Sequence, residues 1–76
     1  MDRATISNLT VWDTAARCFI KLQPGALLRG CRILPFLSIG PQDQPAAYAA
    51  EFVWEDRLYR CALHGFLPRT RVIGAE

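Results

Sequence analysis

One cysteine and the single histidine of this 76-residue chain lie three positions apart, and two more cysteines precede them. Cys61 and His64, together with Cys18 and Cys31, are of residue types that bind zinc. Structural zinc sites usually place two ligands on a tight C-x-x-C knuckle, but Cys18 and Cys31 are widely separated. On a strand, residues 61 and 64 point to opposite faces, unless a turn at His64 brings them together. The spacing therefore favours neither a zinc site nor a Cys–His nucleophile, and we expect no metal or other cofactor.

The acidic residues that could serve as an acid–base pair lie close to arginines. In an antiparallel hairpin Glu51 would lie diagonal to Arg60, which predicts a solvent-exposed ion pair worth at most about 1 kcal/mol. Glu55 and Asp56 fall near Arg57 in the same way. The chain has no Gly-x-Ser-x-Gly element and no phosphate-binding glycine loop, and a domain this small leaves little room for a deep substrate pocket. We therefore predict a protein without enzymatic activity.

Arginine dominates the basic residues, with eight arginines, one lysine and a net charge of +2. From residue 57 to residue 75 the chain carries arginines and no acid. In a small barrel the last strand lies near earlier strands, so these arginines could form one patch that faces phosphates, with exposed aromatic rings, Phe36 among them, for base stacking. The alternative is a solvated arginine face neutralised by nearby acids. The candidate interaction residues are Arg32, Arg57, Arg60, Arg69, Arg71, Tyr48 and Phe66.

Residues 48 to 64 predict the element that positions many of these side chains. Apolar and polar residues alternate on both sides of a reversal, which is typical of a β-hairpin. One face of the hairpin is wholly apolar, whether the turn has two residues or a four-residue loop from 55 to 58. With a turn at Asp56 and Arg57, the predicted cross-strand pairs are Trp54 with Tyr59, Phe52 with Cys61, and Ala50 with Leu63.

Short strands separated by breaks are predicted along the rest of the chain. β-Branched residues favour a strand over residues 9 to 12. A third candidate strand covers residues 31 to 39, where Pro35 restricts it to an edge, a bulge or a strand end. Residues 40 to 45 are the strongest loop signal, and residues 70 to 73 form a short final strand. Together these strands predict a curved sheet.

Residues 14 to 22 fit two local structures. A turn followed by a strand over residues 17 to 22 agrees with the β character of the neighbouring segments. The alternative is a short helix with Asp13 as its N-cap, whose apolar residues follow helical spacing. We favour the strand, because a two-turn helix is marginal by itself.

The fold class that these elements predict is mostly β: a small antiparallel barrel or curved sheet with five to six strands, SH3-like or OB-like. The whole chain, residues 1 to 76, forms one domain, and residues 74 to 76 are expected to fray. Gly65-Phe66-Leu67-Pro68 followed by a short strand resembles the way in which SH3-type barrels end. The resemblance covers residues 65 to 73, and it implies no ligand, since no acidic ligand-binding loop or aromatic groove of signalling SH3 domains accompanies it.

Size and composition favour a partner. Hydrophobic residues make up 51% of a chain that is close to the lower size limit of a self-sufficient core. Some apolar surface must therefore stay exposed or be shared, which predicts a protein partner or self-association, with nucleic acid as the alternative. No apolar run approaches the roughly 20 residues of a membrane helix, and the start lacks a secretion signal, so we expect a cytoplasmic protein without a membrane partner. The odd number of cysteines favours three small core residues over disulfides.

Overall fold

The computed structural model describes residues 1–42 and 44–73 and folds them into short strands and one helix. Strands β1 to β4 cover Arg3–Thr5, Leu9–Asp13, Cys18–Leu22 and Leu27–Pro35. Strands β5 to β8 cover Ser38–Ile39, Gln44–Pro45, Tyr48–Trp54 and Arg57–Ala62. Helix α1 spans Leu63–Arg69, and strand β9 spans Thr70–Val72. The expected fraying of residues 74 to 76 lies outside the described residues.

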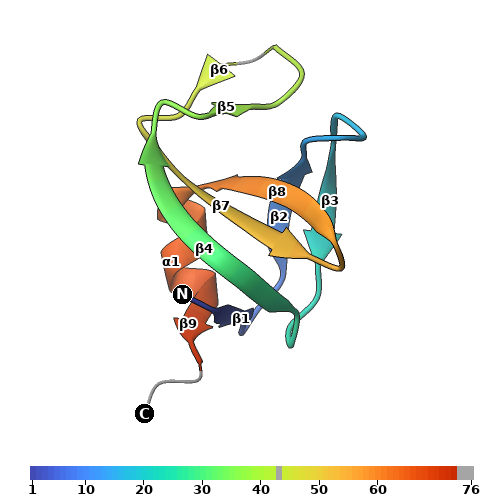
Figure 1. Cartoon of the computed structure of the whole chain (residues 1–76), viewed down its shortest axis with the longest axis vertical. Coiled ribbons are helices and arrows are strands. Elements are labelled where there is room, and N and C mark those ends of the chain that lie inside the picture. The colour runs from blue at the N-terminus through green and yellow to red at the C-terminus, as the bar shows by residue number, and fades with distance from the viewer. Residues whose placement is uncertain (43, 74–76) are drawn as a thin grey trace.

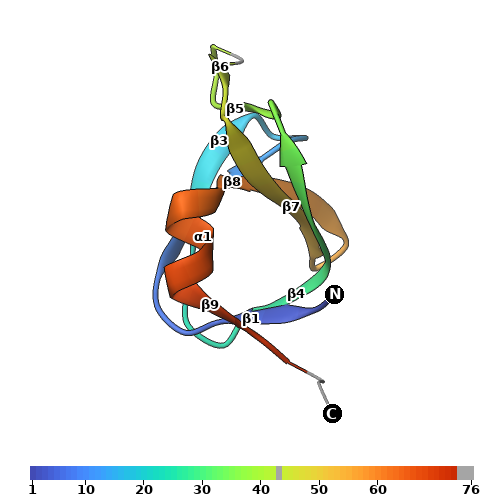
Figure 2. The ribbon, with the colours of Figure 1, turned by 90° about the vertical axis from the view of Figure 1, so that its left-hand side faces the viewer.

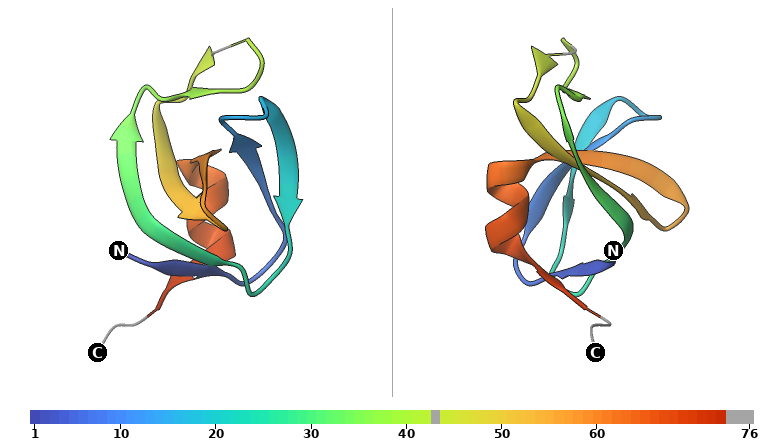
Figure 3. Two further views of the ribbon diagram at one scale, coloured as in Figure 1. Left: turned by 45° about the vertical axis from the view of Figure 1, so that its right-hand side comes forward. Right: turned by 60° about the vertical axis from the view of Figure 1, so that its left-hand side comes forward.

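Seven strands of the described residues form one antiparallel sheet in the order β3-β2-β8-β7-β4-β1-β9. The sheet curls into a half-barrel, and α1 packs beside its concave side (Figures 1 and 2). Strands β5 and β6 form a separate ribbon beyond the ends of β4 and β7 (Figure 3). The predicted mostly β fold with a curved antiparallel sheet is therefore confirmed, with seven strands in the sheet rather than five or six.

The hairpin predicted for residues 48 to 64 is strands β7 and β8, but its predicted register is wrong. Trp54 pairs with Arg57, so the two-residue turn consists of Glu55 and Asp56. Both turn residues have positive φ angles, 48° and 65°, as a type I′ turn requires. The sequence hides this turn because neither residue is the usual asparagine or glycine. The shift moves each residue's partner by two positions, which leaves every side chain on its predicted face. The observed inner pairs are Phe52 with Tyr59 and Ala50 with Cys61.

The strand alternative for residues 14 to 22 is confirmed, and the helix is wrong. Asp13 caps a turn instead of a helix, because its Oδ1 accepts hydrogen bonds of 3.0 Å from the amides of both Ala15 and Ala16. Arg17 then reverses the chain with a φ of 56°, and β3 pairs along the whole of β2. Tertiary pairing with β2 therefore decides a segment whose local pattern allowed both structures.

The helix lies where the sequence predicted a break, at Gly65 and Pro68. Helix α1 directly follows β8, and its spacing turns Leu63 and Phe66 toward the core. Phe66 is only 1% exposed, and its ring centroid lies 5.7 Å from that of Phe52. The expectation of Phe66 as an exposed interaction residue is therefore wrong, and Leu63 belongs to α1 and not to a pair with Ala50.

The inner core lies between the concave face of the sheet and α1.

The cysteines differ in their environments, contrary to the expectation of three core residues. Cys61 is buried in the core, Cys31 is half-buried beside it, and Cys18 is exposed. The buried core residues are Leu9, Val11, Leu22, Leu28, Ala50, Phe52, Tyr59, Cys61 and Phe66.

Candidate functional site

A row of side chains crosses the outer face of the sheet, opposite the core. Trp12 on β2 is only 4% exposed although it does not belong to the inner core. The ring of Phe19 meets it edge-on, with 4.9 Å between centroids, and Gly40 of the β5–β6 region lies against Phe19. The β5–β6 ribbon thus helps to cover this end of the face. Five residues, one on each of β3, β2, β8, β7 and β4, each lie opposite the next one across the sheet. We call them the outer row: Phe19, Trp12, Arg60, Glu51 and Arg32.

Glu51 holds the outer row together. Its carboxylate accepts hydrogen bonds from Arg32 at 2.6 Å and from Nε of Arg60 at 3.1 Å, and its side chain is 7% exposed. Arg60 also donates to the carbonyl of Ser38 at 3.2 Å, which connects β5 to β8. Burial alone would raise the pKa of Glu51, but the two arginines outweigh it and hold the pKa below 4.5. The expected solvent-exposed, diagonal ion pair is therefore wrong, because the register places Arg60 directly opposite Glu51.

The remaining candidate arginines lie apart from Glu51. Arg57 forms an ion pair of 2.9 Å with Asp13. Arg69 donates to the carbonyl of Gly65 within α1, and Arg71 lies on β9, at one edge of the sheet. The structure thus brings together two of the five candidates and does not gather all five at one place.

Asp13 is the second buried carboxylate that has an arginine partner. The amide of Ala16, then that of Ala15, and finally Arg57 hold its pKa below 3.8, against a burial effect that raises it. Asp13 thus closes the turn after β2 and meets the first residue of β8. Its role is structural.

Cys61 and His64 line the same small groove, of about 280 Å³, between the start of α1 and β2. The Cys61 thiol donates toward the carbonyl of Thr10, and burial raises its pKa to about 11. A nucleophilic or zinc-binding cysteine needs the opposite shift, toward the thiolate. Within residues 1–42 and 44–73, no three cysteine, histidine or acidic side chains lie together as metal ligands would.

An exposed apolar patch occupies the end of the β4–β7 arm. Ile33 pairs with Ala50 and Pro35 pairs with Tyr48, so Ile33 and Tyr48 lie diagonally on the same face. Phe36 follows directly and donates its N–H to the carbonyl of Ala47. These three side chains, Ile33, Phe36 and Tyr48, are 53%, 74% and 58% exposed, and we call them the aromatic end.

Phe36 holds an unusual backbone conformation. Its φ is 58°, in the left-handed region that costs a non-glycine residue about 1 kcal/mol. The chain thus holds a bulky aromatic residue in a strained turn and leaves the ring in water. Strained residues of this kind cluster at functional sites, and the exposed ring makes Phe36 a candidate contact residue.

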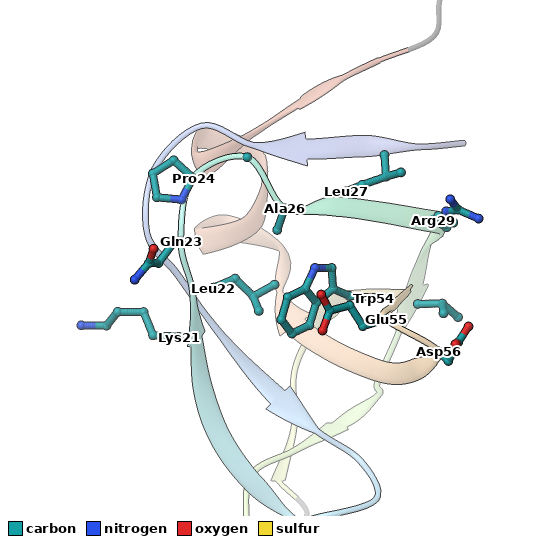
Figure 4. A pocket seen from close by; sticks show the side chains of 12 residues that line it. Lys21, Leu22, Gln23, Pro24, Ala26, Leu27, Arg29, Trp54, Glu55 and Asp56 are labelled. Atoms are coloured by element: carbon teal, nitrogen blue, oxygen red, sulfur yellow. The ribbon is translucent and has the colours of Figure 1, made fainter.

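A second open feature is a groove of about 760 Å³ between the β3–β4 turn and the β7–β8 turn, which we call the Trp54 groove (Figure 4). Half-buried Trp54 packs against the core on one side and lines the groove on the other. Its apolar lining includes Leu22, Ala26, Leu27 and Val53. The charged residues around it are Lys21, Arg29, Glu55 and Asp56.

No protein-family model, no curated protein and no solved structure matches this chain. The fold and its surfaces therefore carry the functional argument. In the part of the chain that the structure describes, no helix has the length and the apolar character needed to cross a membrane.

Sequence reasoning identified Tyr48 as an exposed candidate, and the structure places it at the aromatic end. It missed the outer row and the Trp54 groove. The outer row depends on register, which places Arg32 and Arg60 on the two sides of Glu51. The groove depends on two turns, about thirty residues apart in the sequence, that lie on its two sides. Charge spacing in the sequence predicted the Glu51–Arg60 pair, but it gave no signal for Arg32 as the second partner or for the groove.

Proposed function

We propose that the chain is a small, non-enzymatic protein-interaction domain that binds a partner protein through its aromatic end. The exposed, strained Phe36 beside Tyr48 and Ile33 is the observation that carries this proposal. Large apolar side chains that are exposed near one another on a small domain mark an interaction surface. Aromatic residues are enriched at the centre of such interfaces, where they lose the most water on binding.

The mode of attachment follows from the shape of the arm. Strands β4 and β7 present the aromatic end on paired backbone, so the side chains are held in place before binding and little conformational entropy is lost. The Glu51–Arg32 ion pair joins the same two strands on the opposite face of the sheet and stiffens their pairing. An accessory factor, an inhibitor or an assembly component would use such a surface.

Nucleic-acid binding by the arginines remains an alternative prediction. Glu51 and Asp13 neutralise three of the five candidate arginines, which lowers the positive potential available to phosphates. Binding of this kind should weaken steeply with added salt and when Arg69 and Arg71 are neutralised. If no binding is detected at low salt, this alternative is removed.

The small curved sheet also supports the SH3-like assignment, which stays a prediction.

Site-specific photocrosslinking tests the aromatic end in cells that produce the protein. A photoreactive phenylalanine analogue replaces Phe36 or Tyr48, and Leu67, which is 44% exposed on α1, serves as the matched control position. We expect one defined crosslinked protein from positions 36 and 48 and none from position 67. The additional change Ile33→Ser should abolish the product. Equal products from all three positions, or none from 36 and 48, would contradict the proposed function.

A further inference from the structure

The Trp54 groove combines aromatic surface with carboxylates that the protein itself leaves unneutralised. Glu55 and Asp56 directly follow Trp54 and are exposed. In the described residues, neither carboxylate forms an ion pair or a side-chain hydrogen bond, in contrast to Asp13 and Glu51. The groove therefore offers two negative charges to a partner.

The Trp54 side chain also has unused bonding capacity. Among the described residues, nothing accepts a hydrogen bond from the indole N–H, and no buried polar side-chain atom lacks a partner, so this N–H is open to the groove. Trp54, Glu55 and Asp56 line the groove together, whereas the Lys21 and Arg29 side chains extend away from the indole in Figure 4. The groove thus combines an aromatic ring with an acidic turn, and its basic groups lie at the margins.

The turn fixes the position of these acids. Glu55 and Asp56 form the two-residue type I′ turn of β7 and β8, which holds both backbones in the left-handed region. A two-residue turn leaves the backbone little freedom, so Glu55 and Asp56 keep their place at the edge of the groove before any partner arrives. A prearranged pair of charges binds with less loss of entropy than a flexible loop would.

We infer that the Trp54 groove binds an arginine side chain of a partner polypeptide. The flat face of a guanidinium can stack on an indole ring while the N–H groups at its edge pair with a carboxylate. Its three-methylene stem suits the apolar lining that Leu22 and Ala26 provide. Lysine fits less well, because its compact ammonium is strongly hydrated and does not stack.

The positive groups at the margins restrict where the arginine binds. Lys21 and Arg29 balance the two acids, so the groove as a whole attracts no excess of basic protein from a distance. An arginine gains only when it enters the centre, next to Glu55 and away from both bases. The groove thus selects arginine by direct contact with the side chain and not by its net charge.

Nuclear magnetic resonance of the two indole N–H groups tests this inference. The probe is a blocked heptapeptide with one central arginine between alanines, titrated to about 5 mM, since one side chain binds weakly. We expect the Trp54 resonance to shift and the Trp12 resonance to stay in place. A peptide with citrulline in place of arginine keeps the shape without the charge, and it should bind at least about fivefold more weakly.

Variants separate this site from the aromatic end. The double change Glu55→Gln with Asp56→Asn removes the charge with little change of size, and we expect at least an approximately fivefold loss of arginine-peptide affinity. Tyr48→Ser should leave that affinity unchanged, and an unshifted Trp12 resonance reports that each variant is folded. The inference is overturned if the Trp54 resonance does not move, if citrulline binds as well as arginine, or if Tyr48→Ser is what removes binding. In each case the crosslinking result at positions 36 and 48 still decides the proposed function independently.

Discussion

The hairpin of β7 and β8 carries one acid on the outer face and two at the Trp54 groove, and they differ in burial and in ion pairing. Glu51 lies in the middle of β7, is almost fully buried and has an arginine on each side. Glu55, four residues later, is exposed at the turn and has no ion-pair partner in the described residues. Glu51 lies on a strand that has a paired strand on each side, whereas Glu55 lies in the turn after β7, so their difference comes from the neighbouring strands.

This difference separates a structural carboxylate from an available one. The free-energy cost of removing water from a buried carboxylate must be offset by charge-assisted hydrogen bonds. Arg32 and Arg60 supply these bonds from the two strands beside β7. At the turn there is no strand on either side, so the carboxylates keep their water until a ligand replaces it. The outer row therefore stabilises the sheet, whereas the groove can exchange solvent for a partner.

The largest effect should follow from removal of Glu51. Glu51→Ala leaves two arginines without their shared acceptor and should lower the free energy of unfolding by about 2 kcal/mol, since both arginines retain some contact with water. Glu55→Ala, the control at the turn of the same hairpin, should change stability by less than about 0.5 kcal/mol. Urea unfolding at pH 7 measures both values. Equal losses in the two variants would remove the distinction between the two regions.

Acid should weaken the outer face in the same way without a mutation. The pKa values of Glu51 and Asp13 lie below 4.5 and 3.8 in the folded chain. Their contribution is fully present above these values and is lost as the pH falls through the lower, folded pKa values, because the unfolded chain takes up protons first. We expect urea midpoints to be level between pH 7 and about 5 and to fall below about pH 4.5.

Glu51→Gln sharpens this measurement. The glutamine keeps the size of the side chain but does not titrate, so part of the acid dependence should disappear. A Glu51→Gln variant with an unchanged acid dependence would show that Glu51 is not the group that responds.

The comparison also explains what the sequence could predict. The alternation in residues 48 to 64 predicts which side chains face inward, because facing depends on a period of two and survives an error in register. The partners of Glu51 depend on the register itself, and that register depends on a Glu-Asp turn without the usual turn residues. Because the predicted turn was displaced by one residue, the buried ion pairs of Glu51 were predicted as a single surface pair with Arg60.

The helix and the groove were missed for a related reason. Gly65 and Pro68 are local signals of a break, but the burial of Phe66 against Phe52 stabilises a seven-residue helix that the local pattern does not favour. The Trp54 groove requires the β3–β4 turn to lie next to the β7–β8 turn, and such a long-range contact leaves no trace in spacing. The core face of the hairpin, exposed Tyr48 and strands β2, β3, β7, β8 and β9 were predictable because each follows from residues close in the sequence. The strand predicted for residues 31 to 39 is instead divided between β4 and β5.

The smallest expected effect concerns the turn itself, and it has the opposite sign. Asn-Gly adopts the type I′ turn with little strain, so the double change Glu55→Asn with Asp56→Gly should raise the free energy of unfolding by about 1 kcal/mol. The same change removes both carboxylates from the Trp54 groove and should weaken the arginine peptide. Thermal unfolding and the indole titration, performed on one sample, measure the two effects together.

A gain in stability with a loss of binding would mean that this turn carries its acids at a cost to the fold. A loss of stability would instead show that the acids support the hairpin, and the groove would then resemble the outer face. The glutamine–asparagine variant separates the two causes, since it removes the charges and keeps side chains on both strained residues. It should lose binding without the gain in stability, because the strain resides in the backbone and the binding in the carboxylates.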